Sequence, residues 1–157
     1  MRELLQVSVE RVVPAPPQEV FALLADPRRH RDIDGSGTLR DTVDGPARLF
    51  RGAQFGMRMQ LGGPYAMTNT VVEFEEGRRI AWQPRPSNRL AALAIGGRIW
   101  RYELEPVEGG TLVRETWDIR AERFPLPLLG MRATTRRAMT RTLERLEARL
   151  TAGPAAQ

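Results

Sequence analysis

Glu115 is the ionisable residue whose place in the sequence most favours chemistry. It alternates with Val113, Trp117 and Ile119, and residues two apart in a strand share one face, so an inward-facing apolar set would carry Glu115 inward with it. A carboxylate on that face must find a partner or keep its proton, because an isolated charge is costly to bury. Three residues elsewhere in the chain are candidate partners: Arg11, Arg98 and Tyr102.

Two interpretations of Glu115 follow from this position. In the functional one, Glu115 is a general acid or base, or a polar anchor for a ligand carbonyl, and it is the best candidate for a catalytic residue. In the structural one, it belongs to an internal ion pair or lies at an exposed strand edge.

Other residue types that support catalysis are scarce. The single histidine, His30, stands among Arg28, Arg29 and Arg31, and a histidine in such a run is expected on the solvated surface. Cysteine and lysine are absent, which excludes disulfides, thiol nucleophiles, thiolate metal sites and lysine Schiff bases. The few serines do not stand in a nucleophile elbow, so no catalytic triad is predicted. With one histidine and no cysteine, we expect no metal and no cofactor.

The composition describes a globular, soluble chain. Of 157 residues, 41% are hydrophobic and 27% are charged, and the longest uncharged apolar run, 90–95, is far shorter than the ~20 residues that cross a bilayer. No signal peptide pattern is visible at the N-terminus, so we expect a cytoplasmic location. The net charge of +5 rests on arginine alone, a bias typical of GC-rich coding. No nucleic-acid-binding motif accompanies the charge, and no nucleic acid is expected as a partner.

The elements that must position these residues are mostly strands. Alternating patterns separated by short turns predict an antiparallel meander. Pro14 ends the first strand, Pro17 begins a short helix, and Asp26 caps a second short helix that runs to about Arg31. In the fourth strand, two alternating sets compete for the inward face, and the pattern does not decide between them. The predicted strands are 3–13, 38–43, 55–61, 65–75, 78–83, 98–105 and 111–120.

A long helix, 126–150, closes the chain. Its apolar residues recur at spacings of three and four, as on a helix face that packs against a sheet; they are Leu128, Met131, Thr135, Met139, Leu143, Leu146 and Leu150. Arginines occupy its other faces, which we interpret as solvated, or alternatively as a surface for an anionic lipid, nucleic acid or an acidic partner.

A second, shorter helix interrupts the strand pattern. The segment 87–95 is rich in alanine and leucine, with Ser87 as the expected N-cap and glycines as the stop. A packing element is the simplest interpretation of this helix; a lid over a cavity, or a surface for a partner or a membrane, is the alternative.

Two segments of the chain resemble the START-like SRPBCC superfamily. The first is VSVERVVPAPPQEVFALLADPRRH, 7–30, and the second is WRYELEPVEGGTLVRETWD, 100–118, which is similar to the polyketide cyclase/dehydrase branch. The matching residues of the first segment are Val13, Ala15, Pro16, Val20, Phe21, Leu24, Asp26 and Pro27. The resemblance implies an α+β helix-grip fold, also seen in pathogenesis-related allergens: a seven-stranded antiparallel curved sheet around a long C-terminal helix, with two short helices after the first strand and a cavity for an apolar molecule. We expect a single domain over 1–151 and a disordered tail over 152–157.

The expected function is binding of a hydrophobic small molecule, such as a lipid, a polyketide-like or an aromatic compound, by a monomer or homodimer. The first alternative is a cofactor-independent polyketide cyclase/dehydratase that uses acid/base catalysis in the same cavity. The second alternative is an interaction module that uses the basic C-terminal helix. Adaptable methionines and aromatic residues suit a cavity for apolar guests, although each is also an ordinary core residue. The candidate ligand-binding residues are Phe55, Met57, Met59, Tyr65, Met67, Trp82, Arg98, Trp100, Tyr102, Glu115, Trp117, Met131, Thr135 and Met139.

Overall fold

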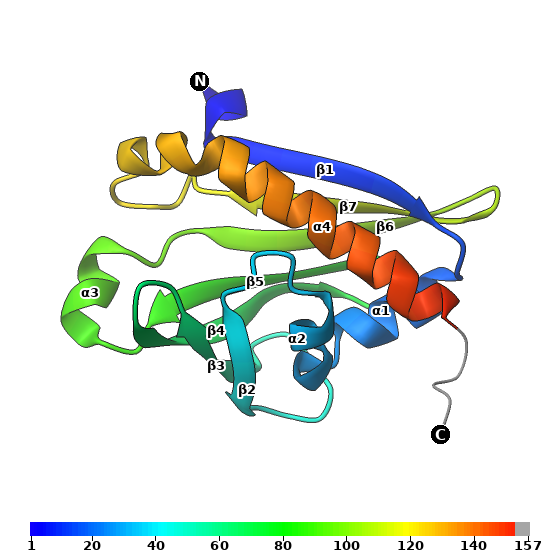
Figure 1. Ribbon diagram of the computed structural model, residues 1–157, viewed down its shortest axis with the longest axis horizontal. Helices are drawn as coiled ribbons and strands as arrows, with labels where there is room; N and C mark the ends of the chain where they lie inside the picture. The colour runs from blue at the N-terminus through cyan, green and yellow to red at the C-terminus, as the bar shows by residue number, and fades with distance from the viewer. Residues whose placement is uncertain (153–157) are drawn as a thin grey trace.

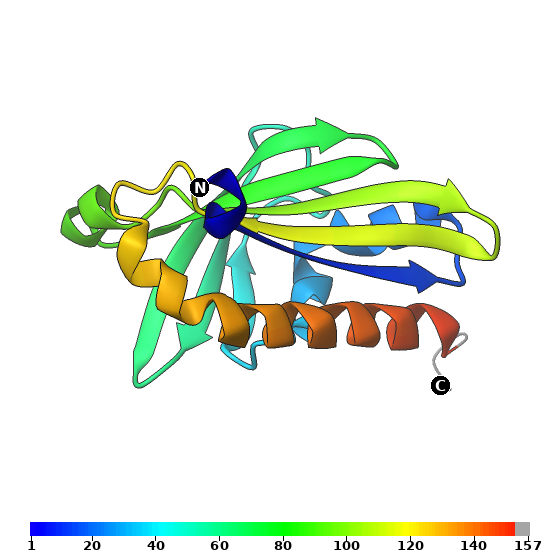
Figure 2. The same ribbon diagram turned by 90° about the horizontal axis from the view of Figure 1, so that it is seen from above.

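A computed structural model describes residues 1–152 and shows a seven-stranded antiparallel sheet that curves around one long helix (Figures 1 and 2). The strand order is β1-β7-β6-β5-β4-β3-β2, so the helix-grip fold is confirmed. The strands are β1 Gln6–Val13, β2 Leu39–Asp44, β3 Gln54–Gln60, β4 Pro64–Glu75, β5 Arg79–Pro86, β6 Ile99–Val107 and β7 Gly110–Asp118. The helices are η1 Arg2–Leu5, α1 Pro17–Leu24, η2 Pro27–Arg29, α2 His30–Ile33, α3 Arg89–Ala94, η3 Leu126–Met131 and α4 Arg132–Thr151. The tail expected over 152–157 lies, apart from its first residue, outside the described residues.

A predicted strand boundary and a predicted helix type are wrong for local reasons. Strand β5 continues past Gln83 through Pro84 and Pro86, because beyond Trp82 it pairs with β4 alone and needs no donors on its other side. The predicted closing helix starts as the 3-10 helix η3, and α-helix begins only after Met131.

The cap of α3 also differs from the prediction. Asn88, not Ser87, is the N-cap, since its side-chain oxygen accepts hydrogen bonds from the backbone N–H groups of Leu90 at 2.9 Å and Ala91 at 3.3 Å.

A bulge in β4 settles which residues of this strand face inward. The register of β4 against β5 shifts between Val71 and Glu73. Up to Val71 the inward set includes Asn69, and beyond the shift Phe74 packs on the core, 5.4 Å from the ring of Phe21. Each of the two competing patterns is therefore correct for one part of the strand, because the extra residue of a bulge exchanges the two faces.

The concave side of the sheet is filled from one end by α1 and α2, and α4 lies across it against β1, β7 and α2 (Figure 1). The buried residues of α4 are Thr135, Met139, Thr142, Leu143 and Leu146. One hydrophobic cluster joins α1 and α2 to strands β3–β7, and a smaller one contains Val7, Trp117, Ile119 and Met139. Within residues 1–152, no helix combines the length and the apolar character needed to cross a membrane.

The arginines of α4 bind neighbouring elements, although the sequence suggests a solvated face. Toward β1, Arg132 donates to the carbonyl of Gln6 at 2.9 Å and Arg136 to that of Ser8 at 3.0 Å. Toward the α2–β2 connection, Arg141 donates to the carbonyl of Gly35 at 3.0 Å. Two more arginines on that side, Arg145 and Arg149, contact Asp34 and Asp32. Arginine contacts thus fix α4 to β1 on one side and to the α2–β2 connection on the other.

Candidate functional site

Glu115 lies inside the curved sheet, paired with one of its three candidate partners. Its side chain is 3% exposed, and the hydroxyl of Tyr102 on the neighbouring strand donates to its Oε1 at 2.9 Å. The other two candidates bind elsewhere, Arg11 to Glu147 and Arg98 to Glu122. The interior carboxyl therefore has a hydroxyl beside it and no cation.

The surroundings of Glu115 keep it protonated. Burial raises its pKa to about 8, the hydrogen bond from Tyr102 opposes this rise, and the nearby Asp34 adds to it. Burial and the neighbouring Glu115 likewise raise the pKa of Tyr102 well above its usual value. At neutral pH the carboxyl of Glu115 is mostly uncharged. Its Oε2 has no hydrogen-bond partner within the described residues.

His30 is a second interior polar group, and its expected surface position is wrong. It is 4% exposed, and its Nε2 donates to the carbonyl of Leu24 at 2.7 Å. Its ring stacks 4.7 Å from that of Trp82 and lies 5.4 Å from that of Phe55. Burial lowers the pKa of His30 to about 4, so the ring is neutral and Nδ1 is a free acceptor with no partner within residues 1–152.

The flanking arginines made His30 look like a surface residue in the sequence. The useful signal was the spacing of His30 and Ile33, which are three apart and form the buried side of α2. Such a short helix gives too little periodicity to show this by itself.

Asn69 is a third interior polar group, which the sequence analysis did not select. It is 1% exposed on the inward face of β4, opposite Phe55 on β3 and Pro84 on β5. In the described residues its amide Nδ2 has no hydrogen-bond partner. The available signal was a polar residue within one of the alternating sets of β4. Because the sequence did not decide which set faces inward, this signal could not be interpreted.

Aromatic rings connect His30 to Glu115 across the sheet, and Asn69 lies opposite Phe55 in the register of β3 and β4. From Phe55, the contacts run to His30, then to Trp82 at 4.7 Å, and from Trp82 to Tyr102 at 5.4 Å. Tyr102 in turn holds Glu115. We call His30, Asn69, Tyr102 and Glu115 the polar floor. Buried polar groups in proteins are nearly always hydrogen-bonded, so three buried atoms without a partner among the described residues are unusual.

An open apolar surface leads to the polar floor from the end of the sheet nearest α3. Exposure falls along each strand in the same direction: on β4 Tyr65 is 40% exposed and Asn69 1%, and on β6 Trp100 is half-buried and Tyr102 4% exposed. Five inward apolar residues, four of them half-buried and Tyr65 exposed, form a surface that we call the inner trough: Met57, Met59, Tyr65, Met67 and Trp100. This apolar surface occupies the place where the sequence predicts a cavity, and the cavity itself stays a prediction.

The other predicted ligand-binding residues lie outside the trough and the floor, apart from Phe55 and Trp82, which lie beside the floor. Trp117 and Met139 are buried in the smaller hydrophobic cluster. Thr135 is buried on α4, and Met131 is 44% exposed on η3.

Arg98 forms an internal ion pair with Glu122, and its contact with a ligand stays a prediction. Its backbone N–H and its Nε both donate to Glu122 Oε1 at 3.0 Å, and the N–H of Gly96 donates to Glu122 Oε2 at 3.2 Å. Burial acts to raise the pKa of Glu122, but these N–H groups and the guanidinium lower it below its usual value. The pair joins the loop after α3 to the loop after β7, away from Glu115.

Replacing Glu122 with glutamine is expected to lower the free energy of unfolding by about 3 kcal/mol, because it leaves Arg98 partly buried without its counter-charge. The effect should shrink as the pH falls, since protonation of Glu122 removes the same charge from the wild type. Urea unfolding at neutral and acidic pH measures both effects, with the exposed Glu144→Gln as the matched control. A loss no larger than that of the control would contradict the structural role.

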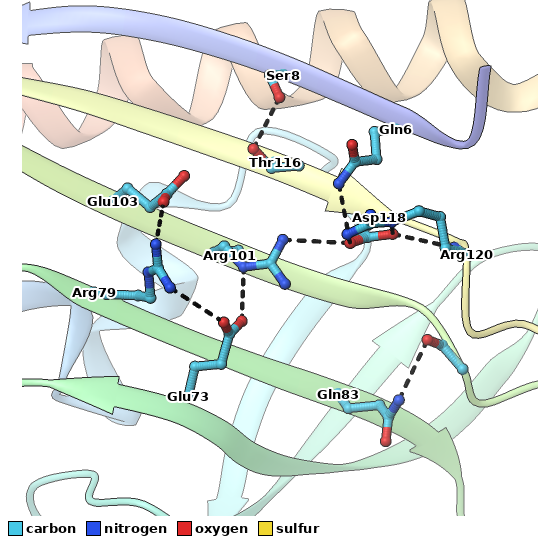
Figure 3. Close-up of polar contacts among 11 residues, drawn as sticks. Gln6, Ser8, Glu73, Arg79, Gln83, Arg101, Glu103, Thr116, Asp118 and Arg120 are labelled. Carbon is cyan, nitrogen blue, oxygen red and sulfur yellow. Dashed lines mark hydrogen bonds and ion pairs between the residues drawn. The ribbon is translucent and has the colours of Figure 1, made fainter. Parts of the chain in front are cut away.

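The outer face of the sheet also carries a hollow, but its charges satisfy one another (Figure 3). This hollow has a volume of about 570 Å³ and is lined by polar residues of β1 and β4–β7. Arg101 binds Glu73 at 2.6 Å and Asp118 at 3.3 Å, and Arg79 binds Glu103 at 2.7 Å. Burial acts to raise the pKa of Asp118, but hydrogen bonds, chiefly from Arg120, lower it to about 2. We interpret this paired surface as the solvated side of the sheet.

The comparisons with known proteins agree with this architecture. A family model described as polyketide cyclase / dehydrase and lipid transport matches residues 5–151. The chain is 40% identical over 118 residues to the uncharacterized protein Rv0088 of Mycobacterium tuberculosis, an alignment that covers 74% of this chain and 48% of that protein. The chain thus spans about half the length of the curated relatives it matches.

Two solved structures illustrate the shared fold. Protein Ms6760 of Mycobacterium smegmatis has a TM-score of 0.74 at 17% identity, over 98% of this chain and 96% of that one. The Aha1 dimer of Colwellia psychrerythraea has a TM-score of 0.65 at 17% identity, over 96% and 98% of the two chains. At such low identities these structures are similar in fold alone.

Proposed function

Because this chain belongs to the polyketide cyclase/dehydrase and lipid transport family, we propose that it binds an apolar small molecule bearing a carbonyl or hydroxyl group. The guest lies in the inner trough with its polar end at the polar floor. One observation carries this proposal: Glu115 Oε2, Asn69 Nδ2 and His30 Nδ1 are buried beneath an apolar surface and have no partner within the described residues.

The hydrogen-bonding character of these atoms narrows the class of guest. Protonated Glu115 and the amide of Asn69 are donors, and both suit a carbonyl oxygen; neutral His30 offers an acceptor at Nδ1, which suits a hydroxyl. Each such hydrogen bond contributes about 1 kcal/mol to the binding free energy, and a buried donor that is left without an acceptor costs more than that. Burial of the apolar part of the guest supplies most of the binding free energy, at about 25 cal/mol per Å² of buried surface before the costs of association.

Displacement of a bound dye tests the proposed function. We expect the uncharged dye Nile red to bind the protein and to be displaced by long-chain or aromatic ketones. Met59→Glu, on the inward face of β3, should weaken dye binding about tenfold, because it places a charge in the trough. Gln60→Glu adds the same charge on the opposite face of the same strand and should leave binding unchanged. The proposal is wrong if no displaceable binding occurs below millimolar dye, or if the two variants behave alike.

Acid/base catalysis is a second candidate, favoured by the pKa of about 8 at Glu115, since an effective catalytic group titrates near the working pH. In this mechanism the ionised form of Glu115 removes an α-proton from a poly-β-ketone. The resulting enolate carbon attacks another carbonyl of the same molecule and forms a carbon–carbon bond. The alkoxide then takes the proton back from Glu115, so that the enzyme is restored.

Glu115→Gln separates catalysis from binding. The amide cannot accept the α-proton, so cyclisation of a poly-β-ketone should fall at least about a hundredfold, while Nile red binding stays within a few-fold of the wild type. Chromatography of the products measures the first quantity. Equal cyclisation by wild type and variant would exclude Glu115 as the acid/base group and leave the binding function in place.

A further inference from the structure

One end of the molecule carries a cluster of exposed apolar side chains. In α3, Leu90 and Leu93 are 79% and 66% exposed, and no residue of this helix is buried. Phe124 and Leu126, before and in η3, are 56% and 73% exposed. The segment that carries them lies at the same end of the molecule as α3 (Figures 1 and 2). Together with Ile95, which is 42% exposed, we call these five residues the apical patch.

The two segments that form the apical patch are fixed to each other. Glu122, between β7 and η3, accepts hydrogen bonds from Gly96 and Arg98, which follow α3. At Gly97 a side chain is excluded, because a Cβ there would lie 2.0 Å from the carbonyl oxygen of Ala121. These contacts fix the segment with the exposed leucines against the segment with the exposed phenylalanine.

The charge around the apical patch is one-sided. Segments 84–98 and 119–132 contain six arginines and a single acidic residue, Glu122, which is taken up by Arg98. Within residues 1–152, no ion pair involves Arg85, Arg89 or Arg123. By contrast, the arginines of the outer face of the sheet are paired with carboxylates.

We propose that the apical patch docks onto an anionic membrane surface. Exposed leucines and an aromatic residue, ringed by unpaired arginines, match a surface that is apolar beneath and negative at its headgroups. Docking of a second copy through the same patch would bring two positively charged surfaces together, which the charge opposes. The patch lies at the end of the sheet where the inner trough opens, so a docked molecule would face the membrane with its trough. Docking through the apical patch requires no ligand in the inner trough.

Flotation with lipid vesicles tests the proposal. The full chain should float with vesicles containing phosphatidylglycerol at low salt, float less at high salt, and stay unbound with pure phosphatidylcholine. Leu90→Ser combined with Leu93→Ser should weaken binding about tenfold or more, because these side chains lose the apolar contact. Phe50→Ser is the matched control. Phe50 is 55% exposed, and it precedes β3, at the end of that strand farther from the apical patch.

A charge reversal gives a second arm. Arg89→Glu should reduce binding to phosphatidylglycerol vesicles about tenfold, whereas Arg51→Glu, the same change beside Phe50, should have little effect. Absence of binding by the wild type at low salt, or equal losses in the patch and control variants, would overturn the proposal. A shift to dimer in sedimentation that is lost in the Leu90/Leu93 variant, without vesicle binding, would assign the patch to self-association instead. Nile red binding by this variant should be unchanged, which keeps the two proposals separable.

Discussion

Glu115→Gln is expected to make the protein more stable than the wild type at alkaline pH and about equally stable at about pH 4. The folded protein holds the pKa of Glu115 at about 8, whereas an exposed glutamate in the unfolded chain titrates near its usual value of about 4.3. Between these two values the unfolded wild type releases the proton and the folded form retains it. Stability that is fully present below about pH 4 is therefore lost progressively as the pH rises toward 8.

Glutamine removes this loss because it has no proton to release, and its oxygen can still accept from Tyr102. The stabilisation at pH 9 is at most about 5 kcal/mol, because the folded and unfolded pKa values differ by roughly 3.7 and each pKa unit corresponds to 1.36 kcal/mol. Thermal unfolding of both proteins at several pH values measures it. His30 provides an internal reference: burial lowers its pKa to about 4, so it costs stability as the pH falls below about 6.5, and this slope should persist in the variant. Parallel stability curves for wild type and variant from pH 4 to 9 would show that Glu115 is not held protonated.

Trp82→Ala is expected to cost about 3–5 kcal/mol of unfolding free energy, the largest loss among the substitutions considered. Trp82 is 7% exposed and lies between the rings of His30 and Tyr102, with Phe55 at its edge. Removing the indole leaves a cavity and admits water to His30. The pKa of His30 should then rise from about 4 toward the usual value of about 6.5.

Urea unfolding gives the stability loss, and nuclear magnetic resonance of the single histidine gives its pKa. Trp82→Phe keeps a ring at this position and serves as the control, with a smaller loss and a histidine that still titrates far below its usual value. If the alanine variant loses less than about 1 kcal/mol of unfolding free energy and His30 titrates as before, Trp82 does not shield the polar floor from water.

The fold was largely readable from the sequence, because strand alternation and turn residues are local signals. All seven strands and both early helices follow from them, and the inward position of Glu115 follows from the period of two. The bulge in β4 was not readable, since an inserted residue leaves two conflicting patterns whose boundary depends on pairing with β5.

The candidate site was only partly predictable, because its members meet through the tertiary structure. Tyr102 was one of three possible partners of Glu115, and the pairing of β6 with β7 makes the choice. His30 was misplaced because its neighbours are charged and exposed while a single turn directs its ring inward. The ion pair of Arg98 was not predictable, since its partner, Glu122, lies 24 residues away in a loop without periodicity.

We propose that a protonated Glu115 receives the polar end of an apolar guest. Titration calorimetry with acetylnaphthalene and ethylnaphthalene, which share an apolar body but differ in the carbonyl, tests it at pH values on either side of the Glu115 pKa of about 8. We expect acetylnaphthalene to bind about tenfold more tightly at about pH 6, and this preference to vanish at about pH 9, where the carboxylate can no longer donate. Equal affinities for the two compounds at both pH values, or no binding of either below millimolar concentration, would contradict the account.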